Sequence, residues 1–103
     1  MVQLSLVEKG LESQRQRTIA ADEARSLAQE FLLRNMKDSL TAGPPSLLIV
    51  DGALAWRAPI LFTQPGGALG EVGEILLVAE SGEVMGWTPS AEVYRNARAL
   101  LTS

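Results

Sequence analysis

The stretch from Gly66 to Trp87, GGALGEVGEILLVAESGEVMGW, constrains the fold of this chain more than any other part. It predicts a glycine-rich loop, an apolar strand at Glu71–Ala79, a tight turn at Ser81–Gly82 and a returning strand at Val84–Trp87. The apolar side chains of the first strand point to both of its faces: Ile75 and Leu77 to one, and Val72, Leu76 and Val78 to the other. Because such a strand is covered on both faces, we expect it at the core of the sheet.

Residues 20–37 predict an amphipathic helix that packs on this sheet. Its apolar residues recur with the spacing of one helical face: Ala24, Leu27, Ala28, Phe31 and Leu32. Asp22 and Glu23 in the first turn and Arg34 and Lys37 in the last turn complement the helix dipole. The segment Thr41–Pro45, TAGPP, ends the helix because proline cannot continue one.

Residues 46–63 predict a β-hairpin. A strand at Ser46–Val50 is followed by the turn Asp51–Gly52 and by a return strand at Ala53–Thr63. Alternation directs one set of side chains of the return strand towards the core and the first helix: Leu54, Trp56, Ala58, Ile60 and Phe62. Pro59 has no N–H to donate, which predicts a sheet edge or a bulge at that point. We expect Gln64–Gly70 to form the loop that follows.

The two ends of the chain differ in how clearly they predict structure. Thr88 and Pro89 predict the start of a last helix, as an N-cap hydroxyl followed by proline at the first helical position. Its apolar stripe is formed by Val93, Ala97, Leu100 and Leu101. Residues 2–9 alternate in the manner of a short strand and residues 11–17 are polar, so strand, helix and linker all stay open there.

Composition limits the chemistry of the chain. It has no cysteine, which excludes disulfides, thiol nucleophiles and cysteine-bound metal, and fits a reducing compartment. It has no histidine, the usual general base near neutral pH and the commonest metal ligand. Histidine-dependent triads and dyads are therefore excluded within one chain.

Charge and hydropathy limit the class of partner. The net charge is −3, and no lysine or arginine occurs between Ala58 and Tyr94, so no nucleic-acid surface is expected. No apolar run is long enough to cross a bilayer, and no signal peptide is visible, so we expect no membrane span and a cytoplasmic protein.

Three sequence features invite a functional interpretation, and each favours a structural one. The glycines of Gly66–Gly73 precede a strand and not a helix, which favours turns and a bulge over phosphate binding. Glu71 and Glu74 point to opposite faces of a regular strand, and they meet only if that strand is bulged. Glu80 and Glu83 flank a turn and are interpreted as solvated. We assign no catalytic, cofactor-binding or metal-binding residue.

A family resemblance covers residues 20–87. The helix with its Ala24-to-Leu32 spacing, the strand around Trp56–Ile60 and the segment Gly73–Val84, GEILLVAESGEV, resemble a PepSY-like domain. Ala79 and Ser81 stand where that family's hairpin usually has Asp and Thr. The resemblance implies a small cystatin-like α+β module linked to the inhibition or regulation of proteases. The hairpin is also similar to that of bacterial immunity proteins, which neutralise a toxin partner.

These observations lead to one set of expectations. We expect a single α+β domain spanning residues 1–103, with an antiparallel meander of about four strands, the first helix on one face and a C-terminal helix. The last helix, the N-terminal segment or a second subunit must cover the other face of the Glu71–Ala79 strand, and we predict a homodimer. The expected function is non-enzymatic: a binding, inhibitory or regulatory module acting through a protein partner such as a protease or a toxin. The alternative is a small-ligand-binding protein with a pocket between sheet and helix.

Overall fold

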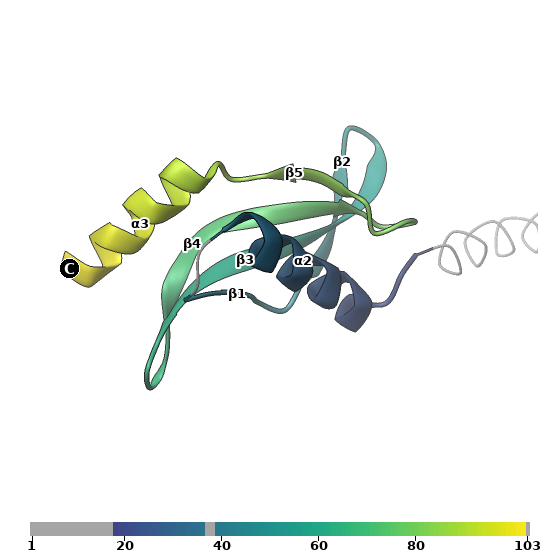
Figure 1. Cartoon of the computed structure of the whole chain (residues 1–103). Helices are drawn as coiled ribbons and strands as arrows, with labels where there is room; N and C mark the ends of the chain where they lie inside the picture. Colours follow the sequence, from purple (N-terminus) through teal and green to yellow (C-terminus); the bar gives the residue numbers. More distant parts are fainter. Residues whose placement is uncertain (1–17, 37–38, 103) are drawn as a thin grey trace, which may run out of the picture.

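The computed structural model of the chain describes residues 18–36 and 39–102. It confirms an α+β fold, which within these residues is a curled antiparallel sheet with one helix before it and one after it (Figure 1). The elements are α2 (Ala21–Asn35), β1 (Leu40–Ala42), β2 (Ser46–Val50), β3 (Ala53–Gln64), β4 (Gly67–Val78), β5 (Val84–Trp87) and α3 (Ser90–Thr102). The alternatives for residues 2–17, and Lys37 in the last turn of the first helix, lie outside the described residues.

The long strand β3 lies inside the sheet. It pairs with β4 along one side, while β1 and β2 lie one after the other along its other side. Pro59 falls at the break between them, where its carbonyl accepts a hydrogen bond from Gly43 N–H at 2.8 Å. The nitrogen of Pro59, which has no hydrogen to donate, faces the same side. Pro59 therefore lies at the gap between β1 and β2, and the predicted sheet edge at this point is this gap at Gly43–Pro45. A Cβ atom on Gly43 would lie 2.8 Å from Pro59 Cγ, which is why the chain needs glycine there.

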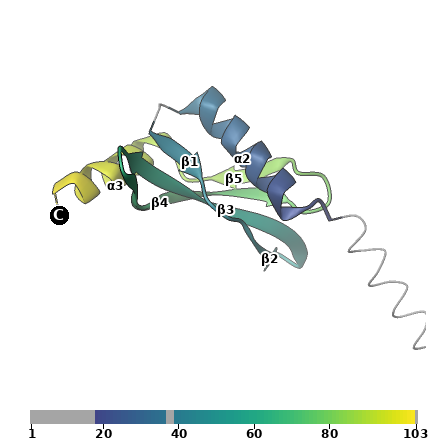
Figure 2. The ribbon, with the colours of Figure 1, turned by 90° about the horizontal axis from the view of Figure 1, so that it is seen from below.

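The helix α2 lies across one face of the sheet (Figure 2). Its predicted stripe is confirmed: Ala24, Ala28 and Leu32 are buried, and Leu27 and Phe31 are half-buried against the core. The helix also covers the outer edge of β1, because Gln29 Oε1 accepts hydrogen bonds from Ala42 N–H at 2.8 Å and from the Thr41 hydroxyl at 3.0 Å. Arg25 Nε donates to the Ala42 carbonyl at 2.9 Å. Strand β1 was not predicted from the sequence.

One core joins the sheet to both helices. Its largest fully buried side chains are Leu32, Ile60, Val72, Ile75, Leu77 and Val93. The predicted position of Val72, on the face opposite Ile75 and Leu77, is wrong. Ile60 pairs with Gly73 whereas Leu61 pairs with Glu71, so Val72 is an extra residue in β4, and this bulge turns it into the core.

The predicted loop Gln64–Gly70 is much shorter than expected. Strand β3 continues to Gln64 and β4 begins at Gly67, so only two residues connect them. Gly66 and Gly67 have φ values of 106° and 133°, which side-chain-bearing residues rarely adopt. The two glycines therefore allow a tight turn, and the strands lengthen at the expense of the loop.

The helix α3 continues alongside β4 where β5 ends. Val93 and Ala97 are buried in the core, Leu100 packs against it, and Leu101 is exposed. The predicted N-cap role of Thr88 is not what the structure shows: its hydroxyl accepts a hydrogen bond from Glu74 N–H of β4 at 3.0 Å. The helix begins at Ser90, so Thr88 attaches the chain to the sheet before the helix starts.

Candidate functional site

Two surface features stand out on the described part of the chain: an exposed apolar hairpin and a cluster of three charged side chains. The hairpin is formed by β2 and the start of β3, joined at Asp51 and Gly52 as predicted. Their φ values of 50° and 81° are both positive, which is the geometry of a type I′ turn. This turn makes Val50 and Ala53 a directly opposed pair and sets the register of the whole hairpin.

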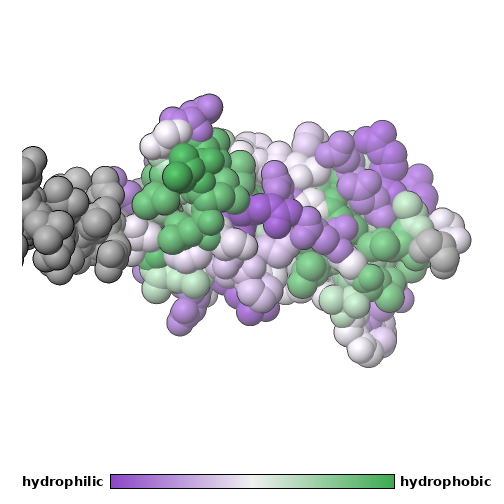
Figure 3. Space-filling view, turned by 180° about the vertical axis from the view of Figure 1, so that it is seen from behind, coloured by the Kyte–Doolittle hydropathy of each residue, from purple (hydrophilic) through white to green (hydrophobic). Residues whose placement is uncertain are grey.

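The hairpin exposes three large apolar side chains. Relative to full exposure, Ile49 is 71% exposed, Leu47 45% and Leu54 40%. They lie on one face, since Leu47 is opposite Trp56 and Ile49 is opposite Leu54. The hairpin tip lies clear of α2 in both ribbon views, and an apolar patch lies over this end of the molecule at the left of Figure 3.

The prediction that Leu54 faces a covered core is therefore wrong. The other members of that set, Trp56, Ala58, Ile60 and Phe62, do belong to the core or pack against it. Trp56 Nε1 also donates a hydrogen bond to the Ile19 carbonyl at 3.0 Å, which fits the predicted packing role of this residue. The alternation was identified correctly, but α2 begins at Ala21, close to Trp56, and does not extend over the tip of the hairpin (Figure 2).

A hollow of about 460 Å³ lies beside the hairpin tip. It is lined by Thr18, Ile49, Gly52, Ala53, Leu54, Val78, Ala79 and Glu80. Most of these residues are apolar or lack a polar side chain. The hollow therefore extends the apolar surface of the hairpin towards the end of β4.

The outer edge of β2 presents backbone groups for pairing. In a hairpin with a two-residue turn, the residues that flank the turn bond to each other, and every second residue points its N–H and C=O away from the partner strand. Val50 and Leu48 therefore bond to β3, whereas Leu47 and Ile49 direct their backbone groups outward. The edge of β1 is covered by Arg25 and Gln29, but no hydrogen bond within the described residues covers the edge of β2.

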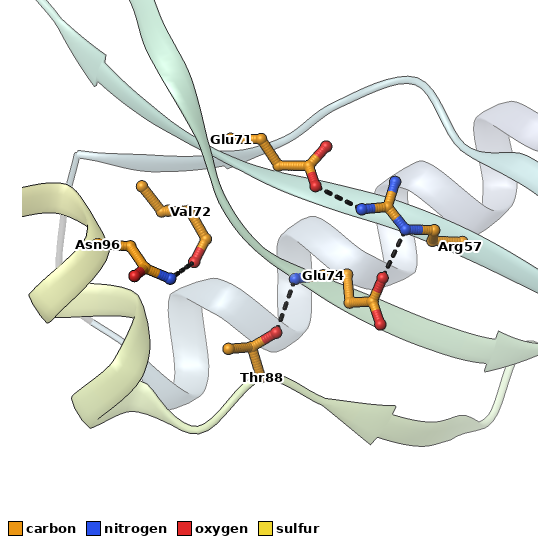
Figure 4. Close-up of polar contacts among 6 residues, drawn as sticks. All are labelled: Arg57, Glu71, Val72, Glu74, Thr88 and Asn96. Atoms are coloured by element: carbon orange, nitrogen blue, oxygen red, sulfur yellow. Dashed lines mark hydrogen bonds and ion pairs between the residues drawn. The ribbon is translucent and has the colours of Figure 1, made fainter. Parts of the chain in front are cut away.

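The second feature is an ion-pair cluster on the face of the sheet away from α2 (Figure 4). Arg57 Nε lies 2.5 Å from Glu74 Oε1, and Arg57 Nη2 pairs with Glu71 Oε2. The bulge at Val72 brings the two carboxylates to the same face of the sheet. The sequence predicts that they meet only if the strand is bulged. Arg57 donates hydrogen bonds to both carboxylates, and these bonds raise the pKa of its guanidinium. The bond to Glu74 has the larger effect and the bond to Glu71 the smaller one.

The chemistry available to this cluster is limited. The side chains of Arg57, Glu71 and Glu74 are 28%, 47% and 42% exposed. Ion pairs at such exposed positions contribute about 0–1 kcal/mol to the free energy of unfolding. Nearby, Asn96 Nδ2 donates to the Val72 carbonyl at 2.9 Å, which attaches α3 to the bulge. Among residues 18–36 and 39–102, no group of three or more acidic residues lies close enough to hold a metal ion. The cluster is best explained as a structural network.

The sequence predicts no site residue, and it does not predict that the β2–β3 hairpin leaves its apolar side chains exposed. The signal that was present is the segment Ser46–Trp56, which contains a single charged residue, Asp51. Neither helix of the described part of the chain is long and apolar enough to cross a membrane. Comparisons of the chain with protein families, with curated proteins and with solved structures find no match.

Proposed function

We propose that this protein is a non-enzymatic binding or regulatory module that acts through a protein partner bound at the β2–β3 hairpin. The observation that carries the proposal is the exposure of Leu47, Ile49 and Leu54 next to a strand edge that no hydrogen bond among residues 18–36 and 39–102 covers. Proteins recognise extended segments at such edges through backbone hydrogen bonds, with side-chain contacts supplying specificity. Exposed apolar surface adjoining the edge adds the driving force for association.

Two further observations support this proposal. The absence of histidine and cysteine leaves few side chains for catalysis or metal binding. The resemblance of residues 20–87 to PepSY-like domains, and of the hairpin around the Glu80–Glu83 turn to that of bacterial immunity proteins, supports an inhibitory role towards a protease or a toxin. We place the protein in the cytoplasm as part of the same proposal, because a cysteine-free chain fits a reducing compartment.

Site-specific photo-crosslinking in the producing cells tests the proposal. A photoreactive amino acid replaces Ile49 in one variant and Leu69 in a control, because Leu69 is also an exposed apolar residue, 49% exposed, but lies near the opposite end of the sheet. We expect a discrete protein adduct from position 49 and none from position 69. The absence of any adduct at position 49 above the control would contradict the proposal.

A second candidate function is the binding of a small apolar ligand. The hollow of about 460 Å³ beside the hairpin supports it, since ligand pockets range from about 300 to 1,000 Å³. The groove between α2 and β5, which matches the expected position between helix and sheet, is smaller at about 210 Å³. A panel of small apolar compounds screened by thermal shift distinguishes the two functions: a raised melting temperature that Ala53→Trp abolishes supports a ligand in the hollow.

A further inference from the structure

We propose that the partner of the hairpin is a second copy of this chain, which joins the two sheets by antiparallel pairing of β2 with β2. This inference rests on the proposed function, because it names the partner of the same surface, and it places a second copy at the hairpin instead of a protease or a toxin. It commits to one occupant and one register, and both follow from the limits of β2 and from its charge.

The length of β2 and the residues at its two ends suit antiparallel pairing with β2 of a second copy. The strand covers only Ser46–Val50, since Pro44 and Pro45 have no N–H to pair at one end and the Asp51 turn closes the other. A twofold axis through Leu48 places the proline end of each copy against the turn end of the other. Each of the residues Ser46–Val50 then lies opposite a β2 residue of the second copy, and no residue of either strand is left without an opposite residue.

The direction of the backbone groups selects this register. Leu47 and Ile49 carry the outward N–H and C=O groups, so they must lie opposite each other across the interface. In the twofold arrangement Leu47 pairs with Ile49 of the second copy, and Ile49 pairs with Leu47 of the second copy. Each of these pairs exchanges two N–H···O bonds in an antiparallel ladder, and Leu48 faces Leu48 of the second copy as a non-bonded pair.

The side chains fit the same arrangement. Opposed residues of antiparallel strands lie on one face of a sheet, so Leu47 and Ile49 of both copies form one apolar cluster. Ile49 is the most exposed large apolar residue of the described chain, and Leu47 is nearly half exposed. Pairing the strands therefore covers the backbone edge and much of the exposed apolar surface at once.

The distribution of charge favours association of two copies through β2 over association through other surfaces of the chain. The chain carries a net charge of −3, so most approaches of two copies are repulsive. Asp51 is the only charged residue of Ser46–Trp56. In the twofold register the two Asp51 residues are offset by about 20 Å along the strands, beyond the Debye length of about 8 Å at physiological salt.

Sedimentation velocity over the micromolar range tests the association, and two variants test its site. We expect a concentration-dependent dimer. Ile49→Glu should weaken dimerisation by about tenfold or more, because it buries an unpaired charge at the interface. Leu69→Glu adds the same charge at another exposed apolar position and should leave dimerisation unchanged. Circular dichroism and melting temperature check that both variants remain folded.

Cysteine crosslinking tests the register, because the chain contains no cysteine of its own. Residues of a non-bonded pair have Cα atoms about 4.5 Å apart, within the range for a disulfide, so Leu48→Cys should form a disulfide dimer on mild oxidation. Leu47→Cys places the two sulfur-bearing residues on a diagonal at about 7–8 Å and should crosslink poorly.

Three outcomes would overturn the inference: a monomer at every concentration, a dimer that Ile49→Glu leaves intact, or crosslinking of Leu47→Cys as fast as that of Leu48→Cys. A monomer whose position 49 crosslinks to a different protein in cells would refute the second copy and still support the proposed function. A monomer with no adduct at position 49 would contradict both.

Discussion

Replacing Gly73 with alanine tests how closely α3 packs on the sheet. A Cβ atom at Gly73 would lie 2.9 Å from Thr88 Cβ and 3.0 Å from both Thr88 Oγ1 and Val93 Cγ2. Carbon atoms in favourable contact are about 3.5–4.0 Å apart. Both neighbours are β-branched and stiff at χ1, and Val93 is fully buried, so neither side chain can turn away easily.

The expected effect follows from two opposing contributions. Gly→Ala at an unstrained position stabilises by about 0.4–1 kcal/mol through the unfolded chain, and Gly73 has no positive φ. Overpacking a tight site costs about 1–3 kcal/mol. Displacing Thr88 also weakens its hydrogen bond with Glu74 N–H, which contributes about 0.5–1.5 kcal/mol. We expect Gly73→Ala to lower the free energy of unfolding by about 1–3 kcal/mol.

Urea denaturation followed by tryptophan fluorescence measures this change, and thermal melting gives an independent value. For a domain of this size, each 1 kcal/mol lowers the melting temperature by about 4–8 °C. Gly86→Ala is the matched control: Gly86 is also a strand glycine without a positive φ, but its nearest neighbour, Leu76 Cδ1, would lie 3.9 Å from the new Cβ. If Gly73→Ala were as stable as Gly86→Ala, the packing of α3 on β4 described above would be wrong.

Three further predictions test other parts of the fold. Leu77→Asp should lower the free energy of unfolding by about 3 kcal/mol or more, because Leu77 is fully buried and the new charge has no partner there; an unchanged melting temperature would contradict this. Gly82→Ala and Gly52→Ala share a φ near +80°, but only Gly82 packs against other side chains, so its variant should melt at the lower temperature. Gln29→Met removes the acceptor of Ala42 N–H and should cost about 1–3 kcal/mol, with faster hydrogen exchange at Ala42 as the specific sign.

The order of most elements could be predicted from the sequence because it rests on local signals. The helical spacing of Ala24, Ala28 and Leu32 reports a buried face directly, and the structure confirms it. The Asp51–Gly52 turn likewise follows from local backbone preference, and both residues have the positive φ that such a turn needs. The α+β class follows from the order of these elements.

The exposure of the β2–β3 hairpin depends on how far α2 extends over the sheet, and only the tertiary structure shows this. Leu54 and Trp56 have the same alternation and the same apolar character, yet Leu54 is exposed and Trp56 packs against the core. The difference depends on the reach of α2 over the sheet, which the spacing of residues within β3 does not encode. The absence of charge around Ile49 was visible in the sequence, but its exposure was not.

The stretch from Gly66 to Trp87 shows the same division. Its sequence alone predicted a buried strand, a glycine turn at its end and a returning strand, because hydrophobic period and turn chemistry are local properties. Only the tertiary structure decided that Val72 is an extra residue in β4, which moves that side chain into the core and brings Glu71 and Glu74 to one arginine. A bulge is set by pairing with a neighbouring strand and by the packing of α3 beside it, and these contacts come from residues distant in the chain.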